Sequence, residues 1–246
     1  MNTPVHPVVR ALKFALVAGV VAASLGATEP LFVAAFDTKP ETAWGELPDG
    51  WWLEGAAAGA RARIAEGRLL LDAMSEKIPG ATVWLNREFS GDLEVAFDVH
   101  VIDAVRAANN MNFFFLFRDP LGQDLFATRA ERTDGRYGRY HSDRLQGTIL
   151  TFLANGHPDV ARVRVRCVPP FEPVLQEYSG HHAKAGTTYR VRLIRRGESF
   201  TCWIDDRTVI ETKLPPTAPK SGWLGFRTWQ TKLWWDNLVV SRPGVD

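Results

Sequence analysis

The sequence predicts an all-β protein, built as an antiparallel two-sheet jelly roll. Three observations predict this fold. Apolar and polar residues alternate with a period of two in many short segments, turn residues separate these segments, and helical spacing is scarce in the 246 residues. Apolar residues make up 46% of the chain, which is enough material for one large core.

The alternation is clearest in residues 93–101, where every odd-numbered residue from Leu93 to Val101 is apolar. Residues 112–118 are apolar on both faces, as in a central strand that is covered on each side. We expect further strands at residues 83–85, 162–168, 188–194, 222–228 and 233–241, and a hairpin formed by residues 200–204 and 208–212.

The segments between these strands contain the expected loops. Residues 102–111 and 134–160 are predicted to be long loops, and residues 123–132 show helical spacing. Long loops on a rigid β scaffold are where binding residues usually lie.

The N-terminus has the pattern of a secretory signal. Arg10 and Lys13 precede an apolar run from Phe14 to Leu25, and small residues follow it. The run is too short for a membrane span, which needs about 20 residues. We therefore expect a signal peptide at residues 1–28, a single jelly-roll domain at 29–246, and a periplasmic or extracellular location. An uncleaved anchor is the alternative.

Composition excludes one class of partner and favours another. The net charge of +1 argues against a general nucleic-acid binder. Arginine far outnumbers lysine, and arginine grips carboxylate, phosphate or sulfate at two points; GC-rich coding would give the same bias. Cys167 and Cys202 each fall on the apolar side of a strand, where they could pair or remain buried free thiols.

Several stretches resemble a known family. They are Ala81-Thr82-Val83-Trp84-Leu85, Gly138-Arg139-Tyr140-His141, Pro169-Pro170-Phe171, Gly222-Trp223-Leu224-Gly225-Phe226-Arg227-Thr228 and Trp235-Asp236-Asn237-Leu238. They are similar to the YesU-like group, which are bacterial jelly rolls of the concanavalin A-like lectin/glucanase superfamily found among polysaccharide-degradation genes. The chain also resembles, more loosely, the 3-keto-disaccharide hydrolase jelly rolls. The resemblance covers roughly residues 31–242 and implies a concanavalin A-like sandwich with a carbohydrate partner, but no catalytic residues.

The arginines of the 162–168 strand stand out because Arg162, Arg164 and Arg166 share one face. Like charges placed side by side repel one another, so something must offset them. One interpretation is a solvated outer face with carboxylates across the strand. The other is a concave groove that holds the uronate or sulfate groups of a glycan.

Tyr137, Tyr140 and His141 lie just upstream of that strand. Tyrosine and histidine can serve as acid and base in β-elimination of uronates, while arginine neutralises the carboxylate. These residues therefore predict a lyase site, with Tyr140 and His141 as the catalytic pair. The alternative is that the tyrosines only cover the edge of a sheet.

Hydrolysis would need two carboxylates roughly 5–10 Å apart. Glu94 and Asp98 lie about 13 Å apart along one strand, which is too far for a retaining pair. Glu172 and Glu177 flank Pro173 and could converge on a loop. The Glu-x-Asp-x-x-Glu strand of jelly-roll glucanases is absent from the sequence, which argues against a standard glucanase.

Metal ligands and exposed tryptophans complete the candidates. His181 and His182 could bind a metal in a loop with Glu177 or His157, although a surface loop is the simpler interpretation. The sequence assures no cofactor, and it leaves a structural calcium at Asp119 and Asp124 open. The chain has nine tryptophans; we expect most in the core, and Trp229, in a predicted turn, to be exposed for stacking on a sugar ring.

The sequence thus predicts an exported protein that acts on acidic or decorated polysaccharide or oligosaccharide, by β-elimination or by hydrolysis of a glycosidic bond. A non-catalytic carbohydrate-binding jelly roll is the alternative, and a jelly roll that binds a protein partner is a third. The predicted substrate-binding residues are Arg118, Tyr137, Arg162, Arg164, Arg166, Glu177 and Trp229.

Overall fold

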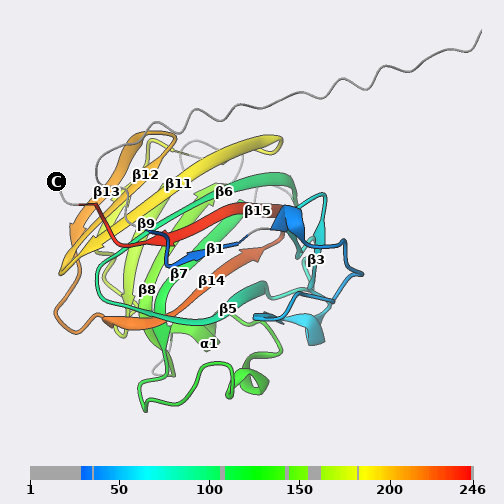
Figure 1. Ribbon diagram of the computed structural model, residues 1–246, viewed down its shortest axis with the longest axis horizontal. Helices are drawn as coiled ribbons and strands as arrows, with labels where there is room; N and C mark the ends of the chain where they lie inside the picture. The colour runs from blue at the N-terminus through cyan, green and yellow to red at the C-terminus, as the bar shows by residue number, and fades with distance from the viewer. Residues whose placement is uncertain are drawn as a thin grey trace, which may run out of the picture.

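Two antiparallel sheets pack face to face in this protein (Figure 1). The structure, a computed structural model, describes residues 29–34, 36–105, 109–141, 144–154, 162–181 and 183–244, with only the backbone of residues 109, 110, 153 and 154. The architecture confirms the predicted all-β jelly roll. The signal peptide predicted at residues 1–28 lies outside the described residues, and none of the described helices has the length and apolar character needed to span a membrane.

The larger sheet has eight strands in the order β13-β12-β11-β6-β15-β4-β3, and β1 pairs with β15 beside this path. Its strands are β1 (Phe32–Val33), β3 (Arg61–Ala65), β4 (Arg68–Asp72), β6 (Leu93–Ala104), β11 (Thr187–Arg196), β12 (Ser199–Ile204), β13 (Arg207–Lys213) and β15 (Thr231–Ser241).

The smaller sheet has seven strands in the order β10-β9-β8-β7-β14-β5-β2. Its strands are β2 (Trp51–Glu54), β5 (Ala81–Ser90), β7 (Asn109–Arg118), β8 (Gln146–Ala154), β9 (Arg162–Val168), β10 (Gln176–Tyr178) and β14 (Ser221–Trp229). In the described ranges, four short helices join the strands: η1 (Phe36–Thr38), η2 (Ala56–Ala58), η3 (Arg129–Arg132) and α1 (Gly138–His141).

The main core lies between the two sheets. Phe97 of β6 packs against Phe113 of β7 and Phe226 of β14, with ring centroids 5.1 and 5.6 Å apart. Trp235 of β15 lies 4.6 Å from the Phe226 ring. Each such buried aromatic ring contributes about 1.5–3 kcal/mol through removal of apolar surface from water. This packing defines the inner face of each sheet, so the alternate residues of each strand lie on an outer face.

The strands predicted from sequence are all present. β9 has the predicted bounds, and the others are longer than predicted. The prediction of a long loop at residues 134–160 is wrong, because this segment contains α1 and all of β8. The segment 102–111 is also partly strand, since β6 ends at Ala104 and β7 begins at Asn109. β8 lacks a readable alternation because it is covered on both faces: Leu150 packs in the main core, while Ile149 packs on the outer face.

The helical spacing of residues 123–132 produces only the single turn η3. The short strands β1 to β4 had no clear signal in the sequence. Cys167 and Cys202 are both buried free thiols, and burial raises the pKa of each. Trp235 is buried in the core, whereas its neighbour Trp234 stacks on His100 on the outer face of the larger sheet.

Candidate functional site

One row of polar residues crosses the whole outer face of the seven-stranded sheet. Its members lie directly opposite one another on consecutive strands, and directly opposed residues share a face. We call this the polar row; from β2 to β10 it consists of Glu54, Thr82, Arg227, Asn112, Thr151, Arg164 and Glu177. A polar residue on every strand makes this row the part of the sheet where chemistry can concentrate.

The row two residues further along the strands is apolar over much of its length. It consists of Trp52, Trp84, Gly225, Phe114 and Ile149. The connection between β7 and β8 covers these side chains with Leu125, Tyr140 and Leu145, and together they form a second apolar cluster. This connection, drawn in green at the bottom of Figure 1, lies against the sheet with α1.

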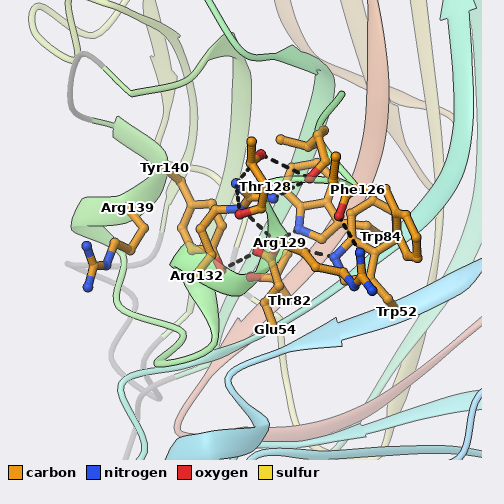
Figure 2. A network of polar contacts seen from close by, with 12 residues as sticks. Trp52, Glu54, Thr82, Trp84, Phe126, Thr128, Arg129, Arg132, Arg139 and Tyr140 are labelled. Atoms are coloured by element: carbon orange, nitrogen blue, oxygen red, sulfur yellow. Dashed lines mark hydrogen bonds and ion pairs between the residues drawn. The ribbon is translucent and has the colours of Figure 1, made fainter. Parts of the chain in front are cut away.

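A buried carboxylate fastens the connection to the sheet (Figure 2). Glu54 of β2 is 1% exposed, and Arg132 of η3 donates to it through Nε over 2.8 Å. The indoles of Trp52 and Trp84 and the Tyr140 hydroxyl also donate to Glu54, over 3.2, 2.9 and 2.9 Å. Burial raises the pKa of the Glu54 carboxyl, and the Arg132 charge opposes this rise.

The remaining N–H groups of Arg132 donate to the β7–β8 connection, to which Arg132 itself belongs. Its Nη2 donates to the Leu125 carbonyl over 2.6 Å, and its Nη1 donates to the carbonyl and hydroxyl of Thr128 over 3.2 and 3.1 Å. The network therefore joins a strand, a helical turn and α1 through one internally neutralised ion pair. Glu54 and Arg132 use their hydrogen-bonding groups within the protein, so this end of the polar row is structural.

Next to this covered region the outer face opens into a pocket of ≈ 260 Å³. Pro79, Asn112, Tyr137, Arg227 and Trp229 line it. Asn112 accepts a hydrogen bond from the Thr151 hydroxyl over 2.7 Å, which fixes the side-chain oxygen of the amide. The Trp229 indole is 37% exposed, as predicted from sequence, although it ends β14 and does not sit in a turn.

Arg227 lies at the base of this pocket. Its Nη1 donates to the Thr82 hydroxyl and the Gly135 carbonyl over 3.1 and 2.9 Å, and its Nη2 donates to the Pro79 carbonyl over 3.0 Å. A side chain at Gly80, where φ is +145°, would collide with the guanidinium. The backbone is therefore built closely around Arg227, which burial leaves with a lowered pKa.

The three arginines of β9 do lie on this outer face, with carboxylates across from them. Arg162 and Arg164 both pair with Glu177, and the Arg162 distance is 3.1 Å. Arg166 pairs with Glu172 over 3.2 Å. Each interpretation of this strand is therefore partly right. The arginines face the side of the sheet that carries the pocket, and each already has an acidic neighbour.

The predicted acid and base occupy different surroundings. Tyr140 is fully buried and donates to Glu54, and burial raises its pKa strongly. His141 packs beside Tyr137 and Phe171, with ring centroids 4.9 and 4.3 Å away. Burial lowers the pKa of His141, and the nearby positive charges of Arg227 and Arg166 lower it further. These placements favour a structural role for Tyr140.

Other predicted residues are spread over the molecule. Arg118 ends β7, roughly 20 Å from Asn112 by strand rise, so it is not brought to the pocket. Glu94 pairs with Arg192 on the outer face of the larger sheet. His157 and His182 lie outside the described residues. Within the described ranges, no three histidine, cysteine or acidic side chains gather as a metal site. A structural calcium at Asp119 and Asp124 stays a prediction.

Sequence reasoning missed Glu54, Asn112 and Arg227. Asn112 and Arg227 stand next to apolar residues of core strands, and their roles depend on the register between strands. The only signal in the sequence was a charged or amide residue within an otherwise apolar strand, as in Gly225-Phe226-Arg227.

Comparisons with known proteins place the chain among lectin-type jelly rolls. The model of a family described as a domain of unknown function, DUF6250, matches residues 76–238. No curated protein matches. A Bacillus subtilis protein of unknown function with a galectin-like fold is similar in structure, with a TM-score of 0.68, 18% identity, and coverage of 86% of this chain and 98% of that one.

Two further solved structures share the fold at low identity. The carbohydrate binding module CBM66 from Bacillus subtilis has a TM-score of 0.53 and 13% identity, covering 78% of this chain and 95% of that one. The potassium-bound Emp46p carbohydrate recognition domain has a TM-score of 0.56 and 13% identity, covering 82% and 94%. These similarities establish a concanavalin A-like lectin-type fold.

Proposed function

The chain belongs to the DUF6250 family of domains of unknown function, and we propose that it is an exported protein that binds carbohydrate in the pocket beside Trp229. One observation carries this proposal: the pocket combines two partly exposed aromatic rings, Tyr137 and Trp229, with polar side chains at its base. Sugar rings stack their C–H faces on aromatic rings and present hydroxyls to polar groups, so the pocket offers both kinds of contact.

The size of the pocket and its polar lining suit a sugar unit. A volume of ≈ 260 Å³ lies just below the usual range for small-molecule sites, which is about 300–1,000 Å³. We therefore assign it one sugar ring, with the rest of the chain outside. The Asn112 amide and the Thr151 hydroxyl form a fixed pair on the sheet, and such preorganised groups orient hydroxyls at little entropic cost.

The structural relatives support this choice. One is titled a carbohydrate binding module and another a carbohydrate recognition domain. The predicted periplasmic or extracellular location, which rests on the pattern of residues 1–28, suits a glycan ligand. Membership of the YesU-like group stays a prediction.

We favour binding over the β-elimination and hydrolysis that the sequence suggested. Tyr140 commits its hydroxyl to Glu54, away from the pocket. The five residues that line the pocket include no carboxylate, whereas hydrolysis needs two. His141 packs against Tyr137 and Phe171, is not among the residues that line the pocket, and has no acidic partner among the contacts described for it.

The test is calorimetric titration of the mature protein with a panel of neutral and acidic oligosaccharides, comparing Trp229→Ala with Trp234→Ala. Trp234 is the matched control, because it stacks on His100 on the other sheet. We expect Trp229→Ala to weaken binding by about 2- to 10-fold, since an aromatic contact contributes about 0.5–1.5 kcal/mol beyond its buried area. Trp234→Ala should leave affinity unchanged.

Equal affinity of both variants and the wild type would contradict the assigned pocket. A parallel assay for new reducing ends and for ultraviolet-absorbing unsaturated products separates binding from catalysis. The proposal expects neither product; turnover of either kind would restore the enzymatic alternative.

A further inference from the structure

Arg227 differs from the other charged groups of the polar row because it is deeply buried without a counter-charge. It is 1% exposed, and its three hydrogen bonds go to neutral oxygens of Thr82, Gly135 and Pro79. Within the part of the chain that the structure describes, no ion pair joins it to a carboxylate. A buried cation is costly unless something compensates its charge.

Comparison with the other buried arginines shows what is unusual. Arg132 is neutralised by Glu54 over 2.8 Å, and Arg166 by Glu172 over 3.2 Å. Arg195 is also held by carbonyls, those of Gly197 and Pro219, but it does not line the pocket. Arg227 alone among these four combines a missing carboxylate with a place at the pocket base.

Two tyrosine rings pack against the guanidinium and keep water away from its charge. The Tyr137 and Tyr140 rings both lie 5.1 Å from the Arg227 guanidinium carbon. Low exposure reduces the screening of charge, so an ion that enters the pocket interacts with Arg227 more strongly than it would in water.

The hydrogen bonds of Arg227 use three of its five N–H groups and leave two donors for a ligand. The three bonds use both hydrogens of Nη1 and one of Nη2. Nε and the second hydrogen of Nη2 have no partner in the described residues. Nε and Nη2 share one edge of the planar group, and such an edge forms two parallel hydrogen bonds with a carboxylate.

We propose that Arg227 selects an acidic sugar, binding the carboxylate of a uronic acid in the pocket through its Nε and Nη2 edge. This inference rests on the proposed carbohydrate binding and names the class of sugar. The acidic group is thus recognised by Arg227 of β14 and not by the arginines of β9, because Arg162, Arg164 and Arg166 already have Glu177 and Glu172 as partners.

A second pocket, on the other sheet, has the opposite character. It has a volume of ≈ 230 Å³, lies on the outer face of the larger sheet, and is lined by Asp98, Thr188, Arg190, Asp205 and Asp206. Three carboxylates around one arginine repel an anion. Charge therefore directs an acidic sugar to the Arg227 pocket.

The first arm of the test uses the wild-type protein and pairs of probes that differ in one charge. Calorimetry compares short oligogalacturonides with their methyl esters, and glucuronic acid with glucose, at low and high salt. We expect the acids to bind about 10- to 100-fold more tightly than the uncharged probes, because a hydrogen bond to a charged group is stronger than a neutral one. A sulfated galactose in the same series tests the choice of a carboxylate. Because an arginine edge can also bind sulfate at two points, sulfate binding equal to carboxylate binding would overturn the assignment of a uronic acid.

The second arm changes the residue. Arg227→Lys keeps the charge and removes the edge, and Arg227→Gln removes the charge; Arg195→Lys is the matched control, a buried arginine held by carbonyls outside the pocket. Folding is checked by circular dichroism and thermal unfolding. We expect both Arg227 variants to lose the preference for acids while Arg195→Lys keeps it. Retention of the preference in a folded Arg227→Gln protein overturns the inference.

If the Arg227 variants do not fold, the wild-type comparison of acid with ester decides alone. Equal binding of acid and ester overturns this inference and leaves carbohydrate binding intact. Binding of no probe at all overturns the proposed function together with the inference.

Discussion

The outer face of the seven-stranded sheet has a closed half and an open half, and each half contains a buried arginine with a different kind of partner. In the closed half, Arg132 contacts Glu54 over 2.8 Å, under a connection that covers the sheet. In the open half, Arg227 is as deeply buried, but it faces a pocket and neutral oxygens. The same residue type therefore stabilises the fold at one place and remains available to a ligand at the other.

The difference shows that burial alone does not identify a structural charge. A buried charge that is neutralised within the protein contributes to the fold, and its loss leaves an uncompensated partner. A buried charge that lacks a counter-ion and borders a pocket is placed to bind one.

The largest effect is expected from Glu54→Gln, because it removes the counter-charge of Arg132 in the closed half. The variant should lose about 3–5 kcal/mol of unfolding free energy, as happens when one partner of a buried ion pair is removed. Urea denaturation measures this loss. Glu172→Gln is the control, since Glu172 is largely exposed and pairs at the surface, and it should change stability by less than about 1 kcal/mol. Similar losses in both variants would contradict the contrast.

A smaller effect is expected from Gly80→Ala, which disturbs only the open half. The added methyl group would collide with the Arg227 guanidinium, and a φ of +145° strains any residue other than glycine. We expect a loss of about 1–3 kcal/mol in stability. Affinity for acidic sugars should fall with it, measured by titration. Gly138→Ala is the control, because nothing crowds a methyl group there. Unchanged acid binding in Gly80→Ala would show that Arg227 need not keep its position.

Arg164→Ala should have little effect in either half. Arg164 pairs with Glu177, which Arg162 also contacts, so one guanidinium remains beside the carboxylate after the change. Exposed pairs of this kind contribute about 0–1 kcal/mol. Stability should fall by less than about 1 kcal/mol, and acid binding should change less than about threefold. A collapse of binding in Arg164→Ala alone would return the site to β9.

The smallest effect concerns pH. The pKa of His141 is lowered by burial and by the charges of Arg227 and Arg166, so the folded protein binds a proton there less readily than the unfolded chain. Its contribution to stability is therefore present above about pH 6.5 and is lost as the pH falls toward the lowered pKa. Denaturation at pH 7 and pH 5 tests this, with His141→Gln expected to reduce the pH dependence. A His141 that titrates above 6.5 by nuclear magnetic resonance would contradict it.

The fold was largely predictable from the sequence, because the alternation of apolar and polar residues that marks a strand lies within the strand itself. The alternation from Leu93 to Val101 predicted β6, and the apolar run at 112–118 predicted β7. β8 escaped prediction because Ile149 and Leu150 pack on opposite faces, which erases the alternation.

The site was less predictable because it depends on register between distant strands. Arg164 drew attention since its neighbours in the chain repeat the charge, yet Glu177 lies opposite it on β10. The only local signal for Arg227 is a charged residue within an otherwise apolar strand. Its significance arises from Gly80, Gly135 and Tyr137, which come from other parts of the chain. A cation without a counter-ion can be recognised only when its surroundings are known.

A crystal structure of the protein soaked with galacturonate tests the central claim most directly. The account predicts a sugar ring against Trp229 or Tyr137, with its carboxylate within hydrogen-bond distance of the Arg227 guanidinium. A carboxylate bound at Arg162 or Arg164, or in the acidic pocket around Asp98, would contradict it.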